Sequence, residues 1–146
     1  MIIDTTYILP LARIGVRTDL LRAIAENRVK SLDFSDLRLS LISLFELQAK
    51  ASRLGIPPED VVKAINVVLK SFRVIPFYEA KIVKIAHELR QSVLSDYIDC
   101  IIVATAVALG DSLATEDRDI LSRRDELRKM FGVDIVSYRD LVESRV

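Results

Sequence analysis

One stretch of the sequence, residues 95–119, limits the possible folds more than any other: SDYIDCIIVATAVALGDSLATEDRD. Apolar residues recur at helical spacing through its first half, so the sequence predicts a helix with a buried face. Ser95 can cap the start of this helix, and Gly110 can end it because glycine accepts the left-handed conformation. A short strand, residues 112–114, follows at once. The stretch therefore predicts a buried helix, a tight turn and a strand.

Acidic residues interrupt this apolar pattern at two places. Asp99 lies one turn into the predicted helix, where a buried carboxylate costs free energy unless a cation, hydrogen bonds or water compensate it. The loop after the strand carries Thr115, Glu116, Asp117 and Asp119. The helix and the loop thus direct acidic groups toward one place.

Short apolar strands alternate with helical segments along the rest of the chain. The pattern predicts strands at residues 1–3, 37–43, 72–76, 112–114 and 133–136. It predicts helices at residues 7–14, 18–27, 43–54, 59–71, 78–92 and 123–130, and a last helix from Tyr138. This alternation implies βαβ units and a mostly parallel sheet with helices on both faces. With no internal repeat or linker, we expect a single α/β domain over residues 1–146.

Composition narrows the classes of function. Hydrophobic residues make up 51% of the chain and charged residues 29%, which is typical of a globular domain. No apolar run approaches the roughly 20 residues that cross a bilayer, and no leader is evident, so we expect a cytoplasmic protein without membrane contact. The single Cys100 rules out an internal disulfide or zinc cluster, and a lone His87 rules out a two-histidine ribonuclease mechanism. Basic and acidic residues balance at 21 each, so nucleic acid binding would need local basic patches.

Four carboxylates are predicted to meet at one edge of the sheet. Asp4 follows the first strand, Glu46 lies in the first turn of the helix after the second, and Asp117 follows the fourth. Asp99 begins the helix that leads into the fourth strand. Parallel α/β sheets bind ligands outside the carboxyl ends of their strands. Four clustered carboxylates would repel one another, whereas Mg²⁺ or Mn²⁺ removes that repulsion and prefers oxygen ligands. The chemistry that follows is attack of metal-activated water on a phosphodiester.

Four short motifs in this order resemble the PIN domain family. They are D-T-T-x-x-L from Asp4, S-L-x-E-L from Ser43, D-x-x-I-x-A-T-A from Asp99, and L-x-T-x-D-x-D from Leu113. The resemblance covers essentially the whole chain, and its size is most similar to the VapC-type toxin ribonucleases of prokaryotic toxin–antitoxin pairs.

The resemblance implies a five-stranded parallel sheet of order 3-2-1-4-5 and a Mg²⁺- or Mn²⁺-dependent endoribonuclease acting on RNA. It also implies a homodimer and a small antitoxin partner. Residue by residue, it assigns the catalytic, metal-binding quartet to Asp4, Glu46, Asp99 and Asp117, and a hydroxyl near the metal to Thr6. Thr115 lies two residues before the last acid of the quartet. Cys100 and Ile120 depart from the residues most frequent in the family, at positions outside the expected chemistry.

Several of these residues also have ordinary structural interpretations. Asp96 can cap its helix, or it can support the metal ligands from a second layer around the ion. Asp119 can have the same supporting role or be a solvated turn residue. Glu46 alone would be an ordinary glutamate of a first helical turn, and its position after the second strand favours function. Thr5 and Thr6 can be simple turn residues.

A basic cluster follows the acidic loop, and we define it as Arg118, Arg123, Arg124, Arg128 and Lys129. Such a run can be a solvated helix face, or it can bind RNA phosphates beside a phosphodiester-cleaving site. Arg13 and Arg17 are weaker candidates for the same role.

The sequence fits other functions less well than it fits a nuclease. A phosphatase with an aspartate nucleophile after the first strand needs a second Asp where this chain has Thr6. No phosphate-binding glycine loop of the Walker or G-x-G-x-x-G type occurs. A PIN-like module that binds RNA or protein without cutting would be expected to lack some of the four acids. A housekeeping RNA-processing nuclease remains an alternative to a toxin.

Overall fold

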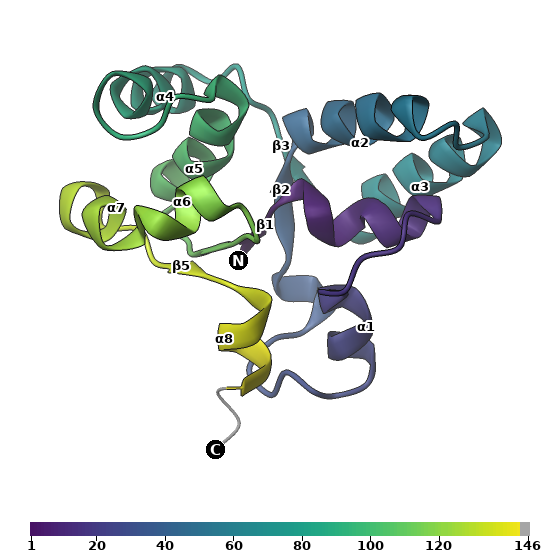
Figure 1. The fold of residues 1–146 in the computed structure, drawn as a ribbon. Helices are drawn as coiled ribbons and strands as arrows, with labels where there is room; N and C mark the ends of the chain where they lie inside the picture. The colour runs from purple at the N-terminus through teal and green to yellow at the C-terminus, as the bar shows by residue number, and fades with distance from the viewer. Residues whose placement is uncertain (144–146) are drawn as a thin grey trace.

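A parallel five-stranded sheet forms the centre of the molecule (Figure 1). A computed structural model of the chain describes residues 1–143. The strands lie in the order β3-β2-β1-β4-β5, and every neighbouring pair is parallel, as the sequence predicted. Their bounds are β1 Ile2–Ile3, β2 Arg38–Ser40, β3 Arg73–Ile75, β4 Leu113–Ala114 and β5 Ile135–Val136. The order reverses between β1 and β4, which places the expected ligand site at the carboxyl ends of these two strands.

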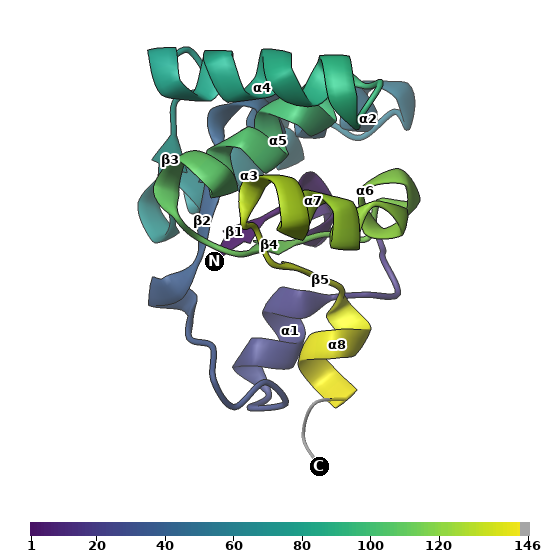
Figure 2. The same cartoon turned by 90° about the vertical axis from the view of Figure 1, so that its left-hand side faces the viewer.

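Helices cover both faces of the sheet, as the alternating pattern predicted (Figures 1 and 2). One face carries the 3₁₀ helix η1 Thr5–Ala12 and the helices α1 Leu20–Ala25, α2 Leu41–Arg53 and α3 Pro58–Ser71. The other face carries α4 Ala80–Ser92, α5 Tyr97–Leu109, α6 Arg118–Ser122 and α7 Arg124–Phe131. The last helix, α8 Tyr138–Glu143, lies beside α1.

The strands are buried on both faces, which explains why they read as apolar runs. Neighbouring residues of one strand enter different cores: Ile3 and Ala114 pack with η1, α2 and α3, whereas Ile2 and Leu113 pack with α4, α5 and α7. Within α5, the run from Cys100 to Ala106 is buried, so the Cys100 thiol is a core residue. Strand β4 contributes to both cores and α5 to the second, and the predicted acids Asp117 and Asp99 lie just after β4 and within α5.

Most helix starts differ from the sequence prediction by one or two residues. Asp96, and not Ser95, caps α5, and its side chain accepts a hydrogen bond from the Asp99 backbone N–H at 3.0 Å. Helix α2 begins at Leu41, earlier than the predicted start at residue 43, because the Ser40 hydroxyl accepts a hydrogen bond from the Ile42 N–H. Serine and aspartate are comparable caps, so composition alone does not choose between neighbours.

The first helical segment is a 3₁₀ helix that contains Pro10. It spans Thr5–Ala12, where the sequence predicted residues 7–14, and its C-cap Arg13 adopts the left-handed conformation (φ 61°). Asp19 caps α1, so this helix starts two residues after the predicted residue 18. The short α6 and a second 3₁₀ helix, η2 Phe34–Asp36, were not predicted, because so few residues give no measurable apolar period.

The predicted domain of residues 1–146 includes three residues, 144–146, that lie outside the described part of the chain. Among residues 1–143, no helix combines the length and the apolar character that spanning a bilayer requires.

Candidate metal-dependent active site

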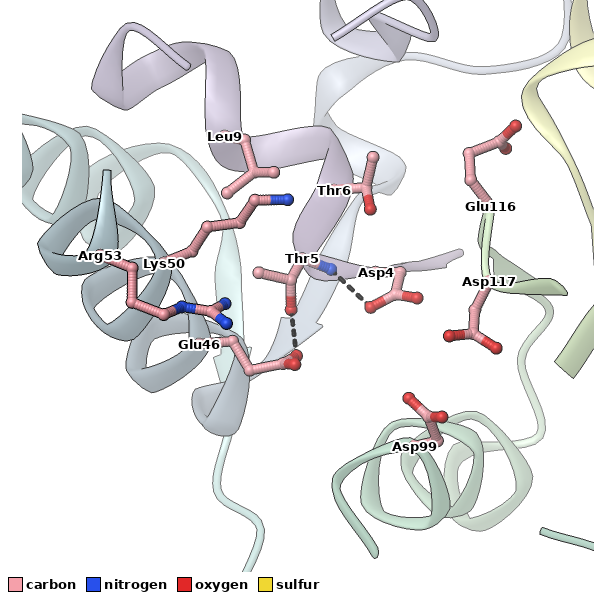
Figure 3. A pocket seen from close by; sticks show the side chains of 10 residues that line it. All are labelled: Asp4, Thr5, Thr6, Leu9, Glu46, Lys50, Arg53, Asp99, Glu116 and Asp117. Atoms are coloured by element: carbon pink, nitrogen blue, oxygen red, sulfur yellow. Dashed lines mark hydrogen bonds between the residues drawn. The ribbon is translucent and has the colours of Figure 1, made fainter. Parts of the chain in front are cut away.

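A cavity of about 260 Å³ opens at the carboxyl edge of the sheet, and all four predicted acids line it (Figure 3). Asp4 enters from the end of β1, Glu46 from α2, Asp99 from α5 and Asp117 from the end of β4. Figure 3 shows the four carboxylates pointing toward a common space. Elements far apart in the sequence therefore bring the predicted quartet together.

Asp4 is the most deeply buried acid of the site, with 7% of its surface exposed. It caps η1, accepting a hydrogen bond from the Thr5 backbone N–H at 2.6 Å, and it also accepts one from the Thr115 hydroxyl at 2.5 Å. Burial raises the pKa of Asp4, and this effect outweighs the opposing effect of both hydrogen bonds. The carboxylate is thus held in one orientation at a net cost in free energy.

Thr115 connects two of the acids. Besides donating to Asp4, its oxygen accepts a hydrogen bond from the Asp117 backbone N–H at 3.0 Å. Asp117 in turn caps α6 by accepting from the Ile120 N–H at 3.0 Å. The threonine therefore connects the end of β1 to the acidic loop, and its role beside a metal stays a prediction.

A threonine from the turn after β1 orients Glu46. The Thr5 hydroxyl donates to the Glu46 carboxylate at 2.5 Å, while Thr6 lines the cavity with its hydroxyl on the Asp4 side. Burial raises the pKa of Glu46, followed by repulsion from neighbouring aspartates that include Asp4. The T-T pair after β1 thus serves the site through both residues.

Asp99 is the least compensated acid. Within the described residues its carboxylate has no hydrogen-bond or ion-pair partner. Burial, followed by repulsion from Asp117 and Asp96, raises the pKa of Asp99 to about 8. The anomaly seen in the sequence is therefore a real electrostatic cost in the fold.

The donor set fits a hard divalent cation. In the described part of the chain, no group of three or more acidic, histidine or cysteine side chains is already arranged to hold a metal ion. The site nevertheless offers only oxygen donors, and the raised pKa values of Asp4, Glu46 and Asp99 show that the protein itself leaves their charge uncompensated. Mg²⁺ and Mn²⁺ prefer carboxylate, hydroxyl and water oxygens, so the residues present are of the type that either ion binds.

Two other acids predicted for the site, Asp96 and Asp119, lie outside the cavity lining. Asp96 caps α5, which was the structural alternative, and its charge adds to the repulsion at Asp99 and Glu46. Asp119 is exposed in the first turn of α6 and does not line the cavity.

The basic cluster does not line the cavity either. Arg123, Arg124 and Arg128 form ion pairs with Glu126, Asp140 and Asp134 at 3.1, 3.1 and 3.3 Å. Arg118 is exposed at the start of α6. A role of the cluster in RNA binding stays a prediction, and its arginines would have to exchange these carboxylates for phosphates.

Sequence reasoning missed two cations in the cavity wall. Lys50 and Arg53 line the cavity from α2, one and two turns after Glu46 (Figure 3). Spacings of four and seven residues put three side chains on one helix face, so the pattern was available from the sequence once Glu46 was placed.

Glu116 was also missed as a partner of the last helix. Its carboxylate accepts hydrogen bonds from the Tyr7 hydroxyl and from the Tyr138 backbone N–H, the latter at 2.8 Å. Arg28 donates to the Tyr138 hydroxyl at 2.9 Å. In Figure 3 the Glu116 carboxylate points away from the quartet. This residue therefore anchors α8 and the acidic loop to the body of the domain.

The protein is therefore an α/β domain with a parallel sheet of order 3-2-1-4-5. Its acidic cavity lies where the strand order reverses, between β1 and β4. The chain belongs to the PIN domain family, whose sequence profile matches residues 1–127. Members of this family are generally nucleases. Comparison with curated protein sequences gives no match.

Several solved structures share this fold, and some of them are toxin–antitoxin complexes. A toxin–antitoxin complex from Klebsiella pneumoniae is 23% identical, with a TM-score of 0.57 over 82% of this chain and 88% of that chain. VapBC2 from Rickettsia felis bound to a promoter DNA fragment is 18% identical, with a TM-score of 0.65 over 93% and 96%. FitAcB from Neisseria gonorrhoeae is 21% identical, with a TM-score of 0.64 over 94% and 96%. At these identities the likeness shows the fold.

Proposed function

We propose that this protein is a Mg²⁺- or Mn²⁺-dependent endoribonuclease that hydrolyses phosphodiester bonds of RNA. The observation that carries the proposal is the uncompensated quartet: four carboxylates face one cavity, and the pKa of Asp99 rises to about 8 because of burial and repulsion. Ordinary folding gives no reason to collect such charges, whereas metal-dependent phosphodiester cleavage requires them. Membership of the PIN domain family supports the same reading.

In this proposal, the carboxylates of Asp4, Glu46, Asp99 and Asp117 would hold the ion. Thr5 and Thr115 hold Glu46 and Asp4 in place through their hydroxyls. The bound ion supplies water activation and stabilisation of the charge on the leaving oxygen. The protein's own contribution is to fix the acids in advance and to leave one side of the cavity open for a phosphodiester.

The biological role we propose is the toxin of a VapBC-type toxin–antitoxin pair. The fold neighbours from Klebsiella pneumoniae, a toxin–antitoxin complex, and from Rickettsia felis, VapBC2, support this role. The proposal includes a small antitoxin partner, a homodimer and a cytoplasmic location. A neighbouring gene for a small DNA-binding protein would support the toxin over a housekeeping RNA-processing nuclease.

Cleavage of RNA tests the proposal directly. The purified protein should cut a labelled single-stranded RNA with Mn²⁺ or Mg²⁺ and stop on addition of EDTA. It should also gain about 2.7 kcal/mol of stability at a Mn²⁺ concentration one hundred times the dissociation constant, measured by thermal melting. Undiminished cleavage in EDTA, by protein free of contaminating nuclease, would rule out the metal mechanism.

A further inference from the structure

The cavity has a cationic side that no step of the proposed metal chemistry uses. Lys50 and Arg53 lie on the face of α2 that also carries Glu46, and Figure 3 shows both charged ends extending toward the site. Both side chains come from exposed positions, and among the described residues neither forms a hydrogen bond or an ion pair. They differ in this from Arg123, Arg124 and Arg128, each of which already has a carboxylate partner.

These cations do not serve to neutralise the quartet. The leading causes of the pKa shift of Glu46 are burial, the Thr5 hydrogen bond and repulsion from aspartates, although Glu46 lies on the same helix face as Lys50 and Arg53. Salt bridges with the nearest acids would be the expected arrangement if their purpose were structural. The two cations are instead held beside the acids with their hydrogen-bonding capacity unused.

An anionic substrate needs help to approach this cavity. Five carboxylates line it, namely those of Asp4, Glu46, Asp99, Glu116 and Asp117, against two cations. The chain as a whole has a formal net charge of zero, so no global field attracts RNA. A divalent ion would lower but not cancel the excess negative charge. Within the cavity, Lys50 and Arg53 are the lining cations that can attract a polyanion.

We propose that Lys50 and Arg53 form a phosphate-binding subsite that holds the backbone of the RNA strand against α2, next to the metal-binding acids. The proposal rests on the proposed nuclease function and adds the residues that position the strand. Lysine and arginine ends hold phosphate oxygens by charge and hydrogen bonding, and such contacts position a strand without reading its sequence. A single-stranded DNA of the same length should therefore use the subsite as well.

The test is the salt dependence of binding to a short fluorescent single-stranded RNA, with Ca²⁺ in place of the catalytic metal. Each phosphate contact on a single strand contributes about 0.7 to the slope of log K against log salt concentration. Replacing Lys50→Gln and Arg53→Gln together should flatten the slope by about 1.4 and weaken binding on the order of tenfold near ~0.1 M salt. The charge-conserving pair Lys50→Arg and Arg53→Lys should keep most of the slope.

A matched control removes the same charge elsewhere. Lys81 and Lys84 are exposed on α4 and do not line the cavity, so the pair Lys81→Gln and Lys84→Gln should leave the slope nearly as in the parent. Thermal melting without metal checks that each variant is folded. An unchanged slope in the α2 variant, or an equal loss in the α4 control, would overturn the subsite.

Cleavage kinetics with Mn²⁺ separate the two proposals. If the parent cuts RNA, the α2 variant should show a higher KM with a smaller change in kcat. If the parent binds RNA but does not cut it, the nuclease proposal fails, and the slope measurement still decides the subsite.

Discussion

Buried carboxylates have cationic partners at the amino end of the parallel sheet and lack them at the carboxyl end. At the amino end, Asp111 lies just before β4 and accepts hydrogen bonds from the Arg38 guanidinium and from its own neighbour, the Ser112 N–H. The N-terminal ammonium of Met1 lies 2.8 Å from the same carboxylate. Burial alone would raise the pKa of Asp111, but these partners outweigh it and the pKa is lowered.

At the carboxyl end, Asp4, Glu46 and Asp99 have raised pKa values, with burial as the largest cause. Lys50 and Arg53 line the same cavity, yet neither pairs with an acid among residues 1–143. The fold can thus supply a carboxylate with cations, and does so at Asp111. At the carboxyl end, in contrast, a whole group of acids has no cationic partner from the protein. We therefore expect a bound ligand to supply the positive charge there.

Asp99→Asn should have the largest effect at the carboxyl end. Changes one shell outside a metal site cost about 10–100-fold, so losing a direct ligand should lower RNA cleavage by more than about 100-fold. Without metal the variant should be as stable as the parent or more so, because one repelling charge is gone. Cleavage assays and melts in EDTA measure both effects.

The exposed Asp125 on α7 provides the control for charge alone, since Asp125→Asn should keep both cleavage and stability. If Asp99→Asn unfolds the metal-free protein, Asp99 is a structural residue. If it cleaves RNA like the parent, the assignment of the quartet is wrong.

Asp111→Asn should have the opposite effects, with lower stability and unchanged cleavage. The change leaves Arg38, whose side chain is 26% exposed, without its anionic partner. We expect a loss of about 1–3 kcal/mol in the free energy of unfolding, measured with urea, and normal cleavage by the folded protein. The exposed pair of Arg128 and Asp134 gives the comparison, since Asp134→Asn should cost less than about 1 kcal/mol. A stable Asp111→Asn variant would show that the two sheet ends do not differ as described.

The smallest expected effect is the pH dependence of the metal-free protein. The pKa of Asp99 is about 8 in the fold and near 3.8 in the unfolded chain, so the folded state binds the proton more tightly. Stability should therefore fall as pH rises from about 4 to 8, by about 1 kcal/mol because solvent screens this half-buried group. Asp111, whose pKa is lowered, should add its own loss only below about pH 4.

Melts in EDTA across this range measure the decline between pH 4 and 8. The decline should be weaker in Asp99→Asn and reduced by saturating Mn²⁺. An equal decline in the parent and in Asp99→Asn would assign the pH dependence to other groups.

Much of the sheet and the quartet could be predicted because both depend on local pattern and topology. Apolar runs separated by helical periods fix a parallel sheet, and the carboxyl ends of its strands meet at one edge, so Asp4, Glu46 and Asp117 could be placed together. Asp99 was recognisable because a carboxylate in an apolar helix has few structural explanations.

Contacts between exposed side chains could not be predicted in the same way. The pair Arg123–Glu126 is readable from helical spacing, but Arg124–Asp140 joins residues of different elements, and only the fold brings them together. The basic cluster therefore looked free in the sequence. Likewise, Glu116 gave no sign of its bond to Tyr138, whose position depends on where α8 docks.

The docking of α8 limits where the chain can be truncated. The family profile ends at residue 127, before β5 and α8. Yet the Thr115 N–H donates to the Val136 carbonyl at 3.0 Å, and the Tyr138 N–H holds Glu116 beside Asp117. A fragment ending at residue 127 would leave β4 as an unprotected edge strand, open to pairing with other chains. The unit to express for any assay is therefore longer than the family profile, because the acidic loop of residues 115–119 is held by hydrogen bonds to the segment after residue 127.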